Sequence, residues 1–195
     1  MSFHALRDYV PGDDRRNVHW RTTARVGRLM VRQFEETRRA HLLLILDLDP
    51  DAWADDQEFE RGVSAAASLS LATMQESKQV SILTQKGSLK APTAMRALDS
   101  LAGVERVWAA ERLPQLARHA AAEVPQASVA VLVTGSRTSA TFIRSAMAHL
   151  PLSMVCATAR MDAGHPMELR TIGGFRVISL PRLDEFGLAM RKVLA

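Results

Sequence analysis

The sequence is poor in the features that mark secreted, disulfide-stabilised and membrane-spanning proteins. Its 195 residues include one cysteine, Cys156, so no disulfide can form within the chain. No apolar run approaches the roughly 18 residues that a membrane-spanning helix requires, and residues 1–10 lack the apolar core of a secretory signal. We therefore expect a cytoplasmic domain in a reducing compartment, with Cys156 packed in its interior.

Basic charge is concentrated at the beginning of the chain. Residues 1–39 contain nine arginines and five acidic residues, so this segment carries a net charge of +4 and the remainder is balanced. A basic segment can face nucleic acid or an anionic membrane surface. Arginines interleaved with acids, however, more often form ion pairs that hold a loop-rich segment on its own domain. We expect the second arrangement, with residues 1–40 packed as a basic segment on the main domain.

From residue 41 onward, apolar runs typical of strands alternate with stretches of helical periodicity. Hydrophobic residues make up 47% of the chain, enough for one sizeable core. Strands separated by helices pair in parallel through right-handed crossovers. The pattern therefore predicts a three-layer, doubly wound, mainly parallel, Rossmann-like α/β domain over residues 41–195. The expected strands are 41–48, 80–84, 128–134, 152–158 and 175–180, with a short sixth at 104–108. The expected helices are 55–77, 93–101, 111–123, 138–150 and 184–194, and residues 85–88 are expected to form a turn.

A dense motif occupies residues 6–34. It comprises Arg7, Tyr9, Gly12 and Asp13, then His19 and Trp20, then Ala24 and Arg25, and finally Leu29, Val31 and Arg32. This motif resembles the signature of the bacterial domain-of-unknown-function family 58, and the similarity continues through Asp47 into residues 59–71. The resemblance implies a von Willebrand factor A-like domain in a protein with amino-terminal membrane helices, encoded beside MoxR-type AAA+ ATPases. Any membrane contact would then be made by segments that are absent from this chain.

The motif residues also have a physical interpretation of their own. Pro11, Gly12 and Asp13 are turn residues, because Pro presets φ, Gly accepts a positive φ and Asp bonds back to the backbone. His19 is interpreted as a packed, hydrogen-bonded histidine. Trp20 is expected to be largely buried, as a large anchor of the segment. Internal ion pairs or hydrogen bonds are expected at Arg7, Asp13, Arg16 or Arg25.

Three carboxylates follow the first predicted strand at alternate positions: Asp47, Asp49 and Asp51. Ligands collect at the carboxyl ends of parallel strands. The resemblance implies a Mg²⁺ motif here, Asp-x-Ser-x-Ser, but acids replace both serines, Pro50 stiffens the loop, and residues 134–136 offer no acid. We expect a degenerate site with no bound cofactor, in which Asp47 caps a turn and the other two carboxylates are solvated. Weak binding of Mg²⁺ is the alternative.

No catalytic constellation is visible in the sequence. There is no glycine-rich phosphate loop and no nucleophile elbow, and the six histidines share no spacing. The sequence therefore predicts a non-enzymatic protein-interaction module, with its site around residues 47–51, Thr84 and residues 134–136. The family resemblance suggests a MoxR-type AAA+ ATPase as the partner, in assembly or maturation.

Two alternatives stay open at this point. One is a metal-dependent phosphodiesterase or nuclease that uses Asp47, Asp49 and Asp51. The other is nucleic-acid binding through the arginine-rich segment. Nucleic acid is not the expected partner, because aromatic residues make up only 5% of the chain and those near the arginines look like structural anchors.

Overall fold

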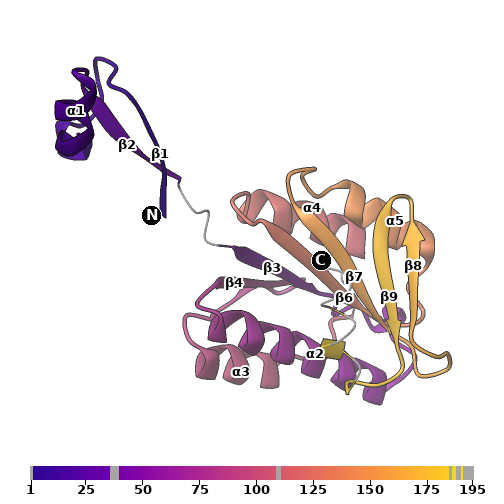
Figure 1. Cartoon of the computed structure of the whole chain (residues 1–195). Coiled ribbons are helices and arrows are strands. Elements are labelled where there is room, and N and C mark those ends of the chain that lie inside the picture. The colour runs from indigo at the N-terminus through magenta and orange to yellow at the C-terminus, as the bar shows by residue number, and fades with distance from the viewer. Residues whose placement is uncertain (1, 36–39, 109–110, 185, 188–189, 191–195) are drawn as a thin grey trace. The chain divides into compact units, whose positions relative to one another are not determined.

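The computed structural model describes residues 2–35, 40–108, 111–184, 186–187 and 190, except for the side chains of 2–4 and 32–35. The chain divides into two compact units, Met1–Arg39 and Ala40–Ala195, which we call the small unit and the main unit (Figure 1). No helix in the described part of the chain has the length and apolarity that a bilayer span needs.

The main unit is built on a seven-stranded sheet with the order β5-β4-β3-β6-β7-β9-β8. The five strands from β4 to β9 pair in parallel, while the edge strands β5 and β8 are antiparallel to their neighbours. The strands are β3 (His41–Leu46), β4 (Gln79–Thr84), β5 (Gly87–Leu89), β6 (Val129–Thr134), β7 (Val155–Met161), β8 (Glu168–Ile172) and β9 (Phe175–Leu180). This arrangement confirms the predicted three-layer, mainly parallel α/β fold.

Helices cover both faces of the sheet (Figure 1). Helices α2 (Asp56–Gln75) and α3 (Ala94–Ala102) cover one face, and α4 (Leu113–Glu123) and α5 (Ala140–Ala148) cover the other. Side chains alternate between the two faces along the central strand β3. Leu42, Leu44 and Leu46 join the hydrophobic core beneath α2 and α3, whereas Leu43 and Ile45 join the core beneath α4 and α5. All six residues of β3 are buried, as expected of a central parallel strand.

Four sequence predictions for the main unit need correction or lie outside the described residues. The first is the turn at residues 85–88, where Gly87 already begins the strand β5. The sequence also gives no prediction of the edge strand β8. Residues 104–108 form no strand, and the fourth parallel strand begins at Val155, not at residue 152. The polar edge strand β8 pairs with β9 as a hairpin. The turn between them is Gly173 and Gly174, whose φ angles of 59° and 88° suit a tight two-residue turn. The expected helix 184–194 lies largely outside the described residues.

The small unit has secondary structure that the sequence analysis did not predict. Strands β1 (Ser2–Asp8) and β2 (Met30–Glu35) pair antiparallel, and η1 (Arg15–Asn17) and α1 (Trp20–Val26) lie between them in the chain. His19 caps α1, because its Nδ1 accepts a hydrogen bond from the Thr22 N–H at 3.2 Å. Gly27 ends α1 with a φ of 72°. The packing of this segment onto the main domain stays a prediction.

One predicted ion pair of the small unit is confirmed. Arg7 donates two hydrogen bonds to the carboxylate of Asp13, at 2.6 and 2.7 Å, and the Val10 N–H donates a third at 2.9 Å. The bonds from Arg7 and then Val10 hold the pKa of Asp13 below its ordinary value. Gly12 has a φ of 111°, so the predicted turn is also confirmed.

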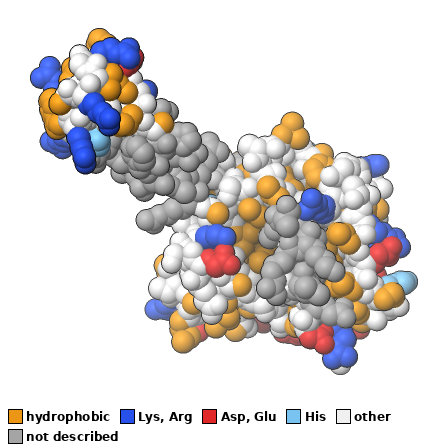
Figure 2. All heavy atoms as spheres, in the orientation of Figure 1, with side chains coloured by type: hydrophobic (Ala, Val, Ile, Leu, Met, Phe, Trp, Pro, Cys, Tyr) orange, Lys and Arg blue, Asp and Glu red, His pale blue; other side chains and the backbone are white. Residues whose placement is uncertain are grey.

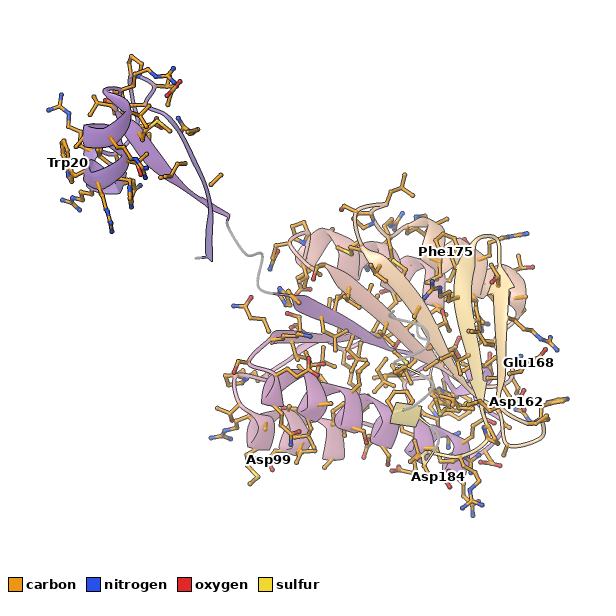
Figure 3. All side chains as sticks on the ribbon, in the orientation of Figure 1. Trp20, Asp99, Asp162, Glu168, Phe175 and Asp184 are labelled. Carbon is orange, nitrogen blue, oxygen red and sulfur yellow. The ribbon has the colours of Figure 1, made fainter. Side chains whose placement is uncertain are left out.

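The prediction that Trp20 is buried is wrong, since 67% of its surface is exposed. Thr22 and Thr23 form the half-buried side of the short helix α1, and the Thr23 hydroxyl accepts a hydrogen bond from the Met30 N–H at 3.0 Å. Trp20 and Ala24 are four residues apart and therefore share the opposite side. In Figure 3, Trp20 lies on the side of α1 that faces away from β1 and β2.

Candidate functional site

Two loops meet at the carboxyl edge of β3 and β6. The first loop follows β3 and contains Asp47, Asp49 and Asp51, the last of them in the short helix η2 (Pro50–Ala52). The second loop follows β6 and consists of residues 135–139. These strands are parallel neighbours, with Leu46 opposite Val133, so the two loops lie side by side. The structure therefore brings together the acids and the 134–136 segment that the sequence singled out.

Asp47 is the buried centre of this site, with 1% of its surface exposed. Its Oδ1 accepts hydrogen bonds from Gln85 Nε2 at 2.7 Å and from the Asp49 N–H at 3.1 Å, which confirms the predicted turn cap. Its Oδ2 accepts a hydrogen bond from Thr134 Oγ1 at 2.9 Å. Burial raises the pKa of Asp47, while the hydrogen bonds from Gln85, Asp49 and Thr134 oppose that rise. Both carboxylate oxygens therefore already have protein partners.

Asp49 is buried, so the prediction that it is solvated is wrong. Its Oδ1 caps η2 by accepting a hydrogen bond from the Asp51 N–H at 3.1 Å, and its Oδ2 accepts one from Arg112 Nη1 at 2.8 Å. Asp51 is exposed, as predicted, with its Oδ2 3.3 Å from the same Arg112 nitrogen. A cation at this position offsets the repulsion between neighbouring carboxylates and favours the burial of Asp49. Sequence reasoning missed Arg112, which lies 63 positions from Asp49.

Glu58, in the first turn of α2, is a third buried carboxylate at this edge, and it is absent from the residues predicted from the sequence. Its Oε1 accepts a hydrogen bond from the Ser136 N–H at 2.6 Å, and its Oε2 accepts one from Ser136 Oγ at 2.9 Å. Asp55 caps the same turn by accepting a hydrogen bond from the Glu58 N–H at 2.7 Å. The Asp-x-x-Glu spacing is a variant of the capping-box pattern, and it is the signal that could have marked Glu58. Glu58 thus ties the loop after β6 to the start of α2.

Several exposed side chains surround these buried acids. A small hollow of about 50 Å³ is lined by Asp49, Arg112, Arg137 and Phe142, among others. Trp108 adds a large apolar side chain at the same edge, because the N–H of the preceding Val107 donates to the Leu48 carbonyl at 2.8 Å. Trp108 is 80% exposed and Phe142 is 42% exposed. We call Trp108, Arg112, Arg137 and Phe142 the rim.

Other predicted site residues do not join this cluster. Thr84 is buried, and its hydroxyl closes the turn before β5 through bonds with the Gly87 carbonyl and the Lys86 N–H. The motif residues Arg7, Tyr9, Gly12, Asp13, Arg16, His19, Trp20, Arg25 and Arg32 belong to the small unit, and the side chain of Arg32 lies outside the described residues. Their role in binding stays a prediction.

The residues at this edge do not fit a magnesium ion. Mg²⁺ requires nearly octahedral oxygen ligands at roughly 2.0–2.1 Å. Here Gln85 and Thr134 engage the oxygens of Asp47, and the guanidinium of Arg112 already compensates Asp49 and Asp51. Across the described ranges, no group of three or more His, Cys, Asp or Glu residues has a metal-binding arrangement. We therefore derive no chemistry through a metal at this site.

Calorimetric titration of the wild-type chain with Mg²⁺ or Mn²⁺ is expected to show no saturable binding at micromolar concentrations. The reason is that a metal would have to displace Arg112 and the hydrogen bonds to Asp47. Removal of that cation in Arg112→Ala is expected to permit at most weak binding, in roughly the millimolar range of incomplete oxygen sites. Micromolar binding to the wild type that Asp47→Ala abolishes would contradict this interpretation.

Comparisons with known proteins agree with the resemblance seen in the sequence. A family model described as "Protein of unknown function DUF58" matches residues 5–127, which is more than half of the chain. The match spans β1 through α4 and includes the motif and all three acids after β3. No curated protein matches the chain significantly. The chain belongs to the DUF58 family of proteins of unknown function.

Proposed function

We propose that this chain is a non-enzymatic protein-interaction module whose binding surface is the rim at the carboxyl edge of the sheet. The observation that carries this proposal is the contrast between the buried acids and their surroundings. The buried acids are satisfied within the protein, whereas Phe142 lines the hollow together with the exposed Arg112 and Arg137. Trp108 exposes a second large apolar side chain, next to the Val107 backbone that bonds to Leu48. Tryptophan and arginine are enriched among the residues that dominate binding energy at protein interfaces.

The same geometry argues against the hydrolytic alternative. Ser136 Oγ donates its hydrogen bond to the Glu58 carboxylate, and the Ser136 N–H donates to the same group. A carboxylate with its oxygens held by these donors is arranged to hold a loop in place. A phosphodiesterase using Asp47, Asp49 and Asp51 would need their oxygens free for metal ions, and Arg112 and Gln85 occupy them.

The partner that we propose is a MoxR-type AAA+ ATPase, in a system for assembly or maturation of other proteins. The support for this partner is the resemblance to family 58, together with the exposed aromatic and arginine side chains of the rim, which are typical of protein interfaces. We also propose that the chain is the carboxy-terminal, cytoplasmic part of a membrane-anchored protein. The support for that proposal is the resemblance to family 58 alone.

The test is binding of the chain to the purified MoxR-type ATPase of the same organism, loaded with a non-hydrolysable ATP analogue. Trp108→Ala, Arg137→Ala and Phe142→Ala are each expected to weaken binding by about 10-fold or more, the size typical of hot-spot truncations. None of the three should change the melting temperature by more than about 2 °C, because all three side chains are exposed.

Leu152→Ala is the matched control. Leu152 is a fully exposed apolar residue that precedes β7, at the opposite edge of the sheet. Its variant is expected to bind like wild type. Equal binding by the three rim variants and the wild type would contradict the rim as the interface, and a complete lack of ATPase binding would contradict the proposed partner.

A further inference from the structure

The small unit gathers exposed apolar side chains at one end of its hairpin. Residues 9–29 connect the end of β1 to the start of β2 and therefore lie together at that end, which we call the tip (Figure 1). The Tyr9 N–H donates to the Leu29 carbonyl at 2.8 Å, which brings the two arms of the tip together. Four large hydrophobic side chains of the tip are exposed, namely Val10, Trp20, Val26 and Leu29. Clustered exposed apolar side chains mark contact surfaces more often than isolated ones do.

The tip also carries cations that have no partner in the described structure. Arg15, Arg16, Arg21 and Arg25 are all exposed, and their side chains make no ion pair or hydrogen bond with any described residue. The acids of the tip, by contrast, are engaged: Asp13 binds Arg7, and Asp14 accepts a hydrogen bond from the Arg16 backbone N–H. In Figure 2, basic and hydrophobic side chains lie next to one another on the visible face of this unit, with little acidic surface.

Helix α1 places tryptophan and arginine on one surface. Successive helical residues are separated by about 100°, so Trp20 and Ala24 lie together and Arg21 and Arg25 lie together beside them. All four are exposed, whereas Thr22 and Thr23 on the other side are half-buried. The outward surface of α1 is therefore an indole ring next to two guanidinium groups that have no partner among the described residues.

We propose that the tip binds the surface of an anionic phospholipid bilayer. Guanidinium groups pair with phosphate through two parallel hydrogen bonds, which suits Arg21 and Arg25 to lipid headgroups. Tryptophan rings are enriched at the level of the headgroups. Exposed aliphatic side chains outside α1, those of Val10 and Leu29, then enter the boundary between headgroups and acyl chains. A nucleic-acid strand would stack on Trp20, but it offers no apolar phase to Val10 and Leu29.

The experiment uses the whole chain and vesicles of phosphatidylcholine with or without an equal part of phosphatidylglycerol. A Trp108→Phe background removes the other exposed indole, and Trp53 is buried, so a change in emission reports Trp20. We expect co-sedimentation with the anionic vesicles at low salt, a blue shift of Trp20 emission, and loss of both at high salt. Arg21→Gln/Arg25→Gln is expected to weaken binding about 25-fold, because each cation near an anionic surface contributes about 5-fold to the affinity.

Arg96→Gln/Arg118→Gln is the control, because it removes the same net charge from exposed arginines of the main unit. It is expected to bind within about two-fold of the parent, since those arginines lie outside the tip. Equal losses in the two double variants, or binding without a blue shift of Trp20, would overturn the proposal. So would binding of a fluorescent single-stranded oligonucleotide more tightly than of the vesicles. This inference does not rest on the rim, and the rim variants provide a separate test of the proposed function.

Discussion

Replacement of Trp53 by alanine is expected to lower the free energy of unfolding by about 3–5 kcal/mol, the range for large aromatic truncations in a core. Trp53 is 1% exposed, and its ring packs on the α2 backbone, where a Cβ at Gly62 would lie 2.3 Å from the indole. It also packs edge-on against Phe59, with ring centroids 5.3 Å apart. Denaturant unfolding followed by circular dichroism measures the loss.

The same substitution should also loosen the candidate site. Trp53 Nε1 donates a hydrogen bond to the Asp47 carbonyl at 3.1 Å, so the indole supports the loop that carries the acids. Trp20→Ala is the matched control and is expected to change the free energy of unfolding by no more than about 0.5 kcal/mol, because Trp20 is exposed. A loss at Trp20 as large as that at Trp53 would show that Trp20 is buried in solution.

The two tryptophans show what a sequence can and cannot predict about burial. Trp20 stands in a dense motif, which predicts an anchor, while Trp53 stands in a loop without any motif. Burial depends on which surfaces meet in three dimensions, and Trp53 meets Gly62 and Phe59 only after η2 turns the chain back onto α2. A motif identifies a family, but it does not predict which side of a seven-residue helix such as α1 faces inward.

The strand predictions are correct where a continuous apolar run is enough to identify a strand. Strands buried on both faces must be continuously apolar, and β3 and β6 satisfy that condition. The edge strand β8 is almost entirely exposed and polar, so no apolar run marks it. Its position follows from pairing with β9 through a glycine turn. The strand pair of the small unit was missed because it likewise has no continuous apolar run.

The candidate site was predicted in part for a similar reason. The acids were found because they follow a recognisable strand, and Thr134 because it ends another. The groups that decide the chemistry of the acids are Arg112 and Gln85, and Glu58 holds the loop after β6. Local sequence carries no signal for these long-range pairs, although the Asp-x-x-Glu spacing marks Glu58 itself. Consequently Asp49 was expected in solvent, although an arginine 63 positions away permits its burial.

The second large effect is expected at Gly135, the first residue of the loop after β6 that Glu58 holds. A Cβ at this position would lie 2.3 Å from the Ala52 carbonyl oxygen, 2.6 Å from Glu58 Oε1 and 2.8 Å from the Trp53 Cα. Two of these atoms belong to the backbone and cannot rotate away. Gly135→Ala is therefore expected to lower the free energy of unfolding by about 3 kcal/mol, at the upper end of the overpacking range.

The substitution should also disturb the rim, because relief of the clash must move η2 away from the loop after β6. That movement would break the hydrogen bond from the Arg137 N–H to the Ala52 carbonyl, now 3.0 Å long, and displace Arg137 at the surface. Binding of the ATPase should then weaken together with stability, when both are measured on the same preparation. Gly103→Ala is the matched control, since its Cβ would meet only ordinary contacts at 3.8 and 3.9 Å. If Gly135→Ala unfolds at the same denaturant concentration as Gly103→Ala, the close approach of the two loops is not a feature of the folded protein in solution.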